Sequence, residues 1–102
     1  MSINLSSVVY LGIGYSQNWY NVTSSRSVST TYYNTTGRVL GLSILITDAT
    51  TFEGNLYVNG EQVQWVKSDA ASDTLFGIVP PGQSYRVTFV GTPTIPVWNE
   101  LY

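Results

Sequence analysis

Short runs of β-branched and aromatic residues, separated by turn-forming residues, constrain this chain more than any other feature. Two turn segments stand out, residues 33–38 (YNTTGR) and residues 79–85 (VPPGQSY), each enclosed by β-rich sequence. Ala, Leu, Glu and Lys never cluster at helical spacing, so we expect almost no helix. The pattern predicts an all-β fold, a single compact antiparallel β-sandwich of jelly-roll type.

The strongest predicted strand covers residues 39–47. It is predicted to be central or to lie at a subunit contact, because Val39 and Leu45 add apolar groups to the face opposite its main apolar side chains. Residues 15–23 are expected to be irregular, and residues 48–54 and 68–73 to form loops. The other expected strands are 5–12, 28–33, 55–58, 61–67, 73–79 and 85–89, with a short closing segment at 97–102. In the strand over residues 85–89, the apolar Tyr85, Val87 and Phe89 alternate with Arg86 and Thr88. The main apolar face of residues 39–47 consists of Leu40, Leu42, Ile44 and Ile46.

The clearest hairpin signal is Asn59-Gly60, a pair that favours a two-residue turn between antiparallel strands. Such a turn pairs Val58 with Glu61 and Leu56 with Val63. Because side chains alternate along a strand, one face of this hairpin is then apolar and we expect it to face the core. That face consists of Leu56, Val58, Val63 and Trp65.

Glycine and proline predict three further features. Gly82 follows two prolines, and we expect it to take positive φ in a turn. Residues 12–14 (GIG) are only a fragment of a phosphate-binding loop and are better interpreted as a bend. Pro93 and Pro96 argue against a central strand around Ile95, because proline has no backbone donor.

Composition narrows the class of protein. The chain has 102 residues, a net charge of −2, 10% charged residues and 14% aromatic residues. We expect one domain, with an N-terminal strand or arm over residues 1–16 and a sandwich module over residues 17–102. The scarcity of charge and the small core favour association with further copies. No basic stripe favours nucleic acid, and no apolar run is long enough for membrane insertion or resembles a signal peptide.

Enzymatic chemistry is not expected, since the chain lacks His and Cys, the commonest general base and thiol nucleophile. Asp69 and Asp73 are the closest carboxylate pair that could serve a glycosidase, although a solvated loop is the simpler interpretation. No ligand spacing indicates a metal or a cofactor. Three Asn-x-Ser/Thr triplets begin at Asn4, Asn21 and Asn34. We take them as chance matches, with Asn34 bonding nearby backbone in a turn.

Aromatic and basic residues are the candidates for contacts. Exposed aromatics stack on sugars or anchor interfaces, although in a small domain they more often belong to the core or a subunit contact. The sequence does not decide whether Trp19 points to the core or to the solvent. Arg26 and Arg38 either are solvated or bond an acidic partner such as Glu100, which would lock the end of the chain. The candidate interface residues are Trp19, Tyr20, Arg26, Tyr33, Asn34, Arg38, Trp98 and Glu100.

The order of these motifs resembles a module of tail-fibre and related structural proteins of tailed bacteriophages. The resemblance covers roughly residues 17–102 and implies a compact β-sandwich at the end of a fibre, usually a homotrimer. It also implies a place in the virion and binding to the host surface. The matching pieces are Trp19, Arg26, residues 33–38 (YNTTGR), 57–60 (YVNG), 79–85 (VPPGQSY) and 98–101 (WNEL).

Two functions are therefore expected. In the first, a homotrimeric virion protein of tail-fibre type binds a host surface glycan or protein through loops 48–54 and 68–73. In the second, a capsid decoration (cement) protein bridges subunits of the phage head, with residues 3–11 as an arm. Only about sixteen residues precede the module where fibre proteins carry a shaft. The chain is therefore expected to be a fibre tip, a small accessory protein of the tail, or a stand-alone module such as a cement protein. Partners are further copies and other tail or capsid proteins. A glycan depolymerase is disfavoured, because the chain lacks His and a credible pair of catalytic carboxylates.

Overall fold

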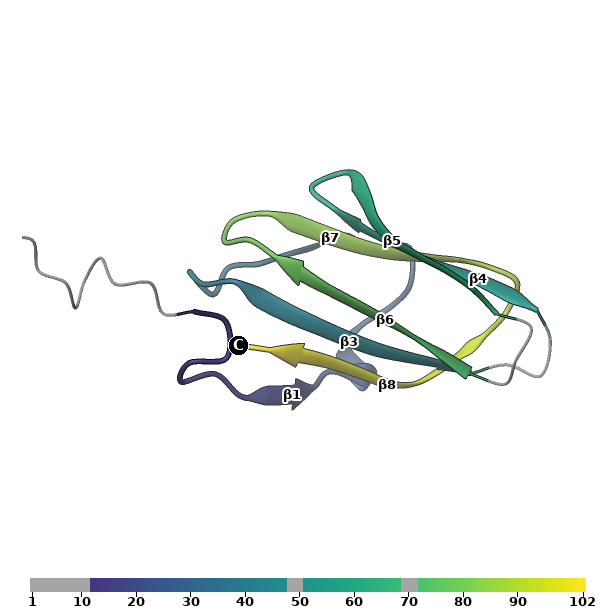
Figure 1. Ribbon diagram of the computed structural model, residues 1–102, viewed down its shortest axis with the longest axis horizontal. Coiled ribbons are helices and arrows are strands. Elements are labelled where there is room, and N and C mark those ends of the chain that lie inside the picture. Colours follow the sequence, from purple (N-terminus) through teal and green to yellow (C-terminus); the bar gives the residue numbers. More distant parts are fainter. Residues whose placement is uncertain (1–11, 48–50, 69–71) are drawn as a thin grey trace, which may run out of the picture.

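The computed structural model describes residues 12–47, 51–68 and 72–102, which form eight strands and one short 3₁₀ helix (Figure 1). The predicted arm over residues 1–16 lies outside the described residues up to residue 11, and so do residues 48–50 and 69–71 of the two predicted loops. The elements are β1 (Trp19–Asn21), η1 (Thr23–Ser25), β2 (Tyr32–Tyr33), β3 (Leu40–Thr47), β4 (Phe52–Val58), β5 (Glu61–Ser68), β6 (Ser72–Val79), β7 (Ser84–Val90) and β8 (Thr94–Leu101).

The strands form two four-stranded antiparallel sheets that face each other (Figure 1). Sheet A has the order β1-β8-β3-β6, and sheet B has the order β2-β7-β4-β5. The expected all-β, sandwich-like fold is confirmed at this level.

The strand pairs are nested about the turn at Asn59-Gly60, as in one long hairpin. β4 pairs with β5, β3 with β6, β2 with β7 and β1 with β8. Successive pairs alternate between the two sheets, so the long hairpin is wrapped around the core. As a result, Trp19 near the start of the described chain pairs with Leu101 near its end.

The core lies between the sheets and confirms the predicted inner face of β3. All four apolar residues of that face are buried, and sheet B supplies the opposite side. The predicted alternation of β7 is also confirmed, since Tyr85 and Val87 are buried whereas Arg86 is exposed. The buried apolar residues are Leu40, Leu42, Ile44, Ile46, Phe52, Leu56, Val58, Leu75, Val79, Tyr85, Val87 and Trp98.

The predicted face of the β4-β5 hairpin is wrong beyond the turn. Val58 pairs with Glu61 as expected, but a β-bulge makes Leu56 pair with Gln64 instead of Val63. A shift of one residue moves every following side chain to the other face. Trp65 is therefore 54% exposed, and Val63 is exposed too. The bulge turns Gln64 inward, where its side chain accepts a hydrogen bond from the backbone N–H of Phe76.

Several element boundaries also differ from the prediction. Residues 28–31 form a loop, because Ser29 has φ +60° and its N–H bonds the carbonyl of Val87 at 2.7 Å. Strands β4 and β6 begin at Phe52 and Ser72, inside the predicted loops, and β1 lies inside the predicted irregular segment. Pro96 belongs to β8, where a register shift against β3 accommodates it at a bulge.

The predicted turns are confirmed. Gly82 has φ +78°, a left-handed conformation that glycine adopts without strain. The bend at residues 12–14 is closed by a 3.0 Å hydrogen bond from the N–H of Tyr15 to the carbonyl of Gly12.

Candidate binding surfaces

The two turn segments that stand out in the sequence lie against each other in the fold. Asn34 joins them: its N–H bonds the carbonyl of Gln83 at 2.8 Å, and its carbonyl accepts the N–H of Gly82 at 2.9 Å. Its side-chain amide donates to the carbonyls of Arg38 (2.6 Å) and Val79 (2.8 Å). With 1% of its surface exposed, Asn34 holds the fold together and is not accessible to a ligand.

The triplets at Asn21 and Asn34 form the same local turn. In each, the asparagine Oδ1 accepts the N–H and the hydroxyl of the threonine two residues on, Thr23 or Thr36. The Thr23 hydroxyl also accepts the N–H of Trp98 at 2.9 Å. The expectation that Asn34 bonds nearby backbone is confirmed, and Asn21 has the same role.

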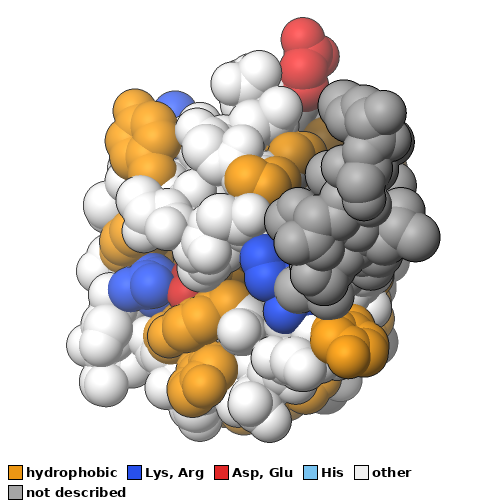
Figure 2. Space-filling view, turned by 90° about the vertical axis from the view of Figure 1, so that its left-hand side faces the viewer, with side chains coloured by type: hydrophobic (Ala, Val, Ile, Leu, Met, Phe, Trp, Pro, Cys, Tyr) orange, Lys and Arg blue, Asp and Glu red, His pale blue; other side chains and the backbone are white. Residues whose placement is uncertain are grey.

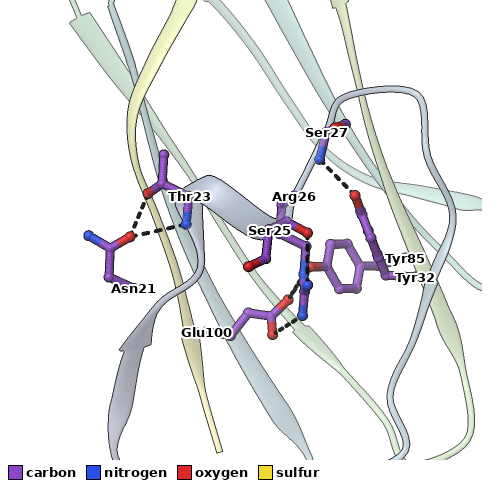
Figure 3. Close-up of polar contacts among 8 residues, drawn as sticks. All are labelled: Asn21, Thr23, Ser25, Arg26, Ser27, Tyr32, Tyr85 and Glu100. Atoms are coloured by element: carbon purple, nitrogen blue, oxygen red, sulfur yellow. Dashed lines mark hydrogen bonds and ion pairs between the residues drawn. The ribbon is translucent and has the colours of Figure 1, made fainter.

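Arg26 and Glu100 form a bidentate ion pair, which confirms the expected partner of Arg26 (Figure 3). Nε donates to Oε2 and Nη2 donates to Oε1, both at 2.9 Å. The Glu100 side chain is 3% exposed and that of Arg26 is 23% exposed. The pair joins the segment after η1 to β8 and so fixes the end of the chain.

Two tyrosines complete this cluster, which we call the clamp (Arg26, Tyr32, Tyr85 and Glu100). The Tyr85 hydroxyl donates to Oε2 of Glu100, and the Tyr32 ring lies 4.7 Å from the guanidinium carbon of Arg26. Burial, together with the hydrogen bond to Glu100, raises the pKa of Tyr85 above its ordinary range. The hydrogen bond to Glu100 raises the pKa of Arg26, which stays charged.

Trp98 packs beside the clamp, with its ring edge-on to Tyr32 at 6.2 Å and tilted against Tyr85 at 6.4 Å. It is buried in the core. Three candidate interface residues, Arg26, Trp98 and Glu100, therefore stabilise the fold and offer little surface to a partner. Arg38 is half-buried, and one of its terminal nitrogens donates to the carbonyl of Gly12 at 3.1 Å.

The remaining candidates are exposed aromatics. Tyr20 stacks on Tyr102 with ring centroids 4.4 Å apart, at the edge of sheet A. Tyr33 is 67% exposed on the outer face of sheet B, since the preceding Tyr32 packs against the core. Trp19 lies on the outer face of sheet A, which answers the question that the sequence left open.

An apolar strip crosses the outer face of sheet A. Trp19, Leu101, Gly41 and Ile78 are successive partners in one row across all four strands. Gly41 leaves a shallow open groove of about 380 Å³ between the larger side chains. We define the apolar strip as Ile13, Trp19, Gly41, Phe76, Ile78 and Leu101.

The whole outer face of sheet A is uncharged over the described residues. Two acidic residues belong to its strands, Glu100 and Asp73, but both occupy inward positions, as partners of Leu42 and Ile46. Figure 2 views the end of the molecule with the C-terminus, where hydrophobic patches lie among mostly uncharged atoms and a few basic and acidic groups. The outward positions are Trp19, Asn21, Gly41, Ser43, Leu45, Thr47, Ser72, Thr74, Phe76, Ile78, Thr94, Val97, Asn99 and Leu101.

The outer face of sheet B has a different chemistry. It carries a pocket of about 390 Å³ lined by hydroxyl groups, one aromatic ring and one guanidinium. Tyr57 and Arg86 are cross-strand partners there, and Tyr33 pairs with the lining residue Ser84. We call this the tyrosine–arginine pocket, lined by Thr31, Tyr57, Gly60, Ser84 and Arg86.

Sequence reasoning missed this pocket, although part of its signal was present. The alternation of β7 already placed Arg86 outward. The alternation along the hairpin placed Tyr57 on the face of its strand opposite to that of Leu56 and Val58. What brings Thr31 to the pocket is the loop before β2, which no sequence pattern indicated. The exposed Trp65 lies further along the same face, opposite Asn55.

Comparisons with protein-family models, curated proteins and solved structures found no match to this chain. Within residues 12–47, 51–68 and 72–102, no helix has the length and hydropathy needed to cross a membrane. The same residues contain no group of three or more side chains suited to hold a metal ion.

Proposed function

We propose that this chain is a non-enzymatic virion structural protein of bacteriophage tail-fibre type, a homotrimer that attaches to a receptor on the host cell surface. The motif order described above supports the class. The observation that carries the proposal is the contrast between the two outer faces. Sheet A presents a neutral apolar strip, suited to assembly, and sheet B presents a polar aromatic pocket, suited to a ligand.

The strand order is consistent with this class. Orders β1-β8-β3-β6 and β2-β7-β4-β5 are those of an eight-stranded jelly roll, an architecture shared by viral capsid and lectin domains. A fold does not decide a function, so the proposal depends on the two faces and the motif order.

The apolar strip is the proposed contact between copies. Trp19, Phe76 and Ile78 are each more than half exposed on one contiguous face. A face without charge can meet a copy of itself without placing like charges together, and the groove at Gly41 accepts a large side chain from the neighbour. Aromatic anchors in such pockets carry most of the binding energy of protein interfaces.

Light scattering after size exclusion tests the assembly. We expect the mass of three chains for the wild type and of one chain for Ile78→Glu, which puts a charge on the strip. Val63→Glu is the matched control, because Val63 is equally exposed but belongs to the hairpin of sheet B. A monomeric wild type, or an Ile78→Glu variant that stays trimeric, would refute the role of the strip.

A capsid decoration protein is the second candidate, favoured by the position of Ile13. The Ile13 side chain lies beside Gly41, since a Cβ atom added to Gly41 would be 3.5 Å from it. Residue 13 therefore lies against the apolar strip. Residues 3–11, the arm that the sequence predicts for this candidate, lie outside the described residues.

Immunogold electron microscopy of intact particles separates the two candidates. Antibody against this chain is expected to label the tail or its fibres. Gold spread over the head would replace the fibre proposal with the decoration protein.

A further inference from the structure

We propose that the tyrosine–arginine pocket binds an acidic sugar, with the Arg86 guanidinium on the sugar carboxylate and the Tyr57 ring against the sugar face. This inference rests on the proposed attachment function and gives it a ligand class and a site. The pocket differs from loops 48–54 and 68–73, where the sequence alone placed receptor binding.

Arg86 is the feature that selects an anion. The described residues provide it with no hydrogen bond or ion-pair partner, whereas Arg26 is paired with Glu100 and Arg38 bonds backbone. The other lining groups of the pocket are neutral, so the site carries one uncompensated positive charge. A guanidinium offers parallel donors that match a carboxylate in bidentate geometry.

The remaining lining groups favour a sugar over a simple anion. Tyr57 supplies the aromatic ring of the pocket beside Arg86, and the exposed Tyr33, which does not line the pocket, is the cross-strand partner of Ser84. Aromatic rings pack against the apolar face of a sugar and keep a polar hydroxyl at the rim. The hydroxyls of Thr31 and Ser84 can both donate to and accept from sugar hydroxyls.

The backbone holds the pocket in place. The hairpin turn is tied to β7, because the N–H of Asn59 donates to the carbonyl of Ser84 at 2.9 Å. On the other side, the N–H of Ser29 donates to the carbonyl of Val87 at 2.7 Å and fixes the loop that carries Thr31. Walls fixed before binding reduce the entropic cost of holding a ligand.

The size of the pocket fits one sugar residue. A volume of about 390 Å³ lies at the lower end of ligand pockets, which span roughly 300–1,000 Å³. A single shallow site of this kind binds weakly, and three copies in one fibre would raise the avidity for a repeating polysaccharide.

The test is a titration of the full chain, labelled with ¹⁵N, with glucuronic acid and with glucose as the neutral match. We expect glucuronic acid to shift the amide signals of Tyr57, Ser84 and Arg86 and to bind about tenfold more tightly than glucose or better. Equal affinity for the two sugars, or the lack of binding by glucuronic acid, would overturn the proposal.

Variants assign the effect to the pocket. Arg86→Met is expected to abolish the preference for glucuronic acid, and Arg86→Lys to weaken it. Lys67→Met is the matched control, since Lys67 is a cation of the same outer face that does not line the pocket. A preference that survives in Arg86→Met, or that is lost in Lys67→Met, contradicts the assignment. If inorganic phosphate at equal concentration displaces glucuronic acid, the pocket selects an anion and not a sugar, and the proposed ligand class is wrong.

This experiment and the test of the proposed function fail independently. Sugar binding by the purified chain does not depend on the location of the protein in a particle. Gold labelling of the head together with the glucuronic acid preference would leave the pocket valid and reject the fibre. Gold labelling of the tail without binding of glucuronic acid would leave the fibre proposal valid and reject the pocket.

Discussion

Replacing Glu100 by glutamine tests the clamp with almost no change in shape. The carboxylate accepts two hydrogen bonds from Arg26 and one from Tyr85, and its side chain is 3% exposed. The amide cannot neutralise the guanidinium, which then lies mostly buried without a counter-charge. Breaking a buried pair by removing one partner costs about 3–5 kcal/mol.

We expect the lower end of that range, about 3 kcal/mol, because the Arg26 side chain is 23% exposed and retains some hydration. Such a loss is a large part of the stability of a small domain and lowers Tm by roughly 10–20 °C. Urea denaturation followed by tryptophan fluorescence measures the difference in the free energy of unfolding.

Glu61→Gln is the matched control, because Glu61 is exposed at the β4-β5 turn. We expect it to change the free energy of unfolding by less than about 0.5 kcal/mol. If Glu100→Gln is as stable as this control, the ion pair contributes nothing measurable and the argument from burial is wrong.

Three further predictions concern stability. Tyr85→Phe destabilises the protein at pH 7. Because the pKa of Tyr85 is raised in the folded state, the tyrosine of the unfolded wild type ionises first, so the gap in unfolding free energy between wild type and variant shrinks above about pH 10. A gap that stays constant from pH 7 to 11 contradicts this. Val87→Ala costs about 2 kcal/mol or more through cavity formation, whereas Trp65→Ala costs under about 1 kcal/mol in urea titrations; equal costs would mean that the faces are misassigned. Asn34→Ala costs about 2–3 kcal/mol, because it removes the buried amide that donates to the carbonyls of Arg38 and Val79, and an unchanged Tm would argue otherwise.

Local patterns in the sequence predicted much of the fold. The inner face of β3, the turn at Asn59-Gly60 and the alternation of β7 depend on residues close in the chain, so periodicity and turn chemistry were sufficient. The failures were also local in origin. One extra residue in the β4-β5 hairpin reversed the predicted face of Trp65, and no propensity of Val63 marks it as a bulge.

The candidate site was predicted less well than the fold. Composition suggested that some aromatics would be exposed, but it could not separate the buried Trp98 from the exposed Trp19 and Trp65. The pairing of Arg26 with Glu100 was one of two options left by the sequence. Choosing between them required the fold, because 74 positions separate the two residues in the chain.

By itself, the sequence determined the all-β class, the positions of the main turns and the scarcity of charge, because these follow from backbone preferences and composition. Only the tertiary structure decided which outward side chains share a surface. Nesting the strand pairs places Trp19, Gly41 and Ile78 in one row. It also brings Thr31 to Tyr57 and Arg86. Pairing between distant strands sets these neighbours, and its register depends on the packing of the whole core.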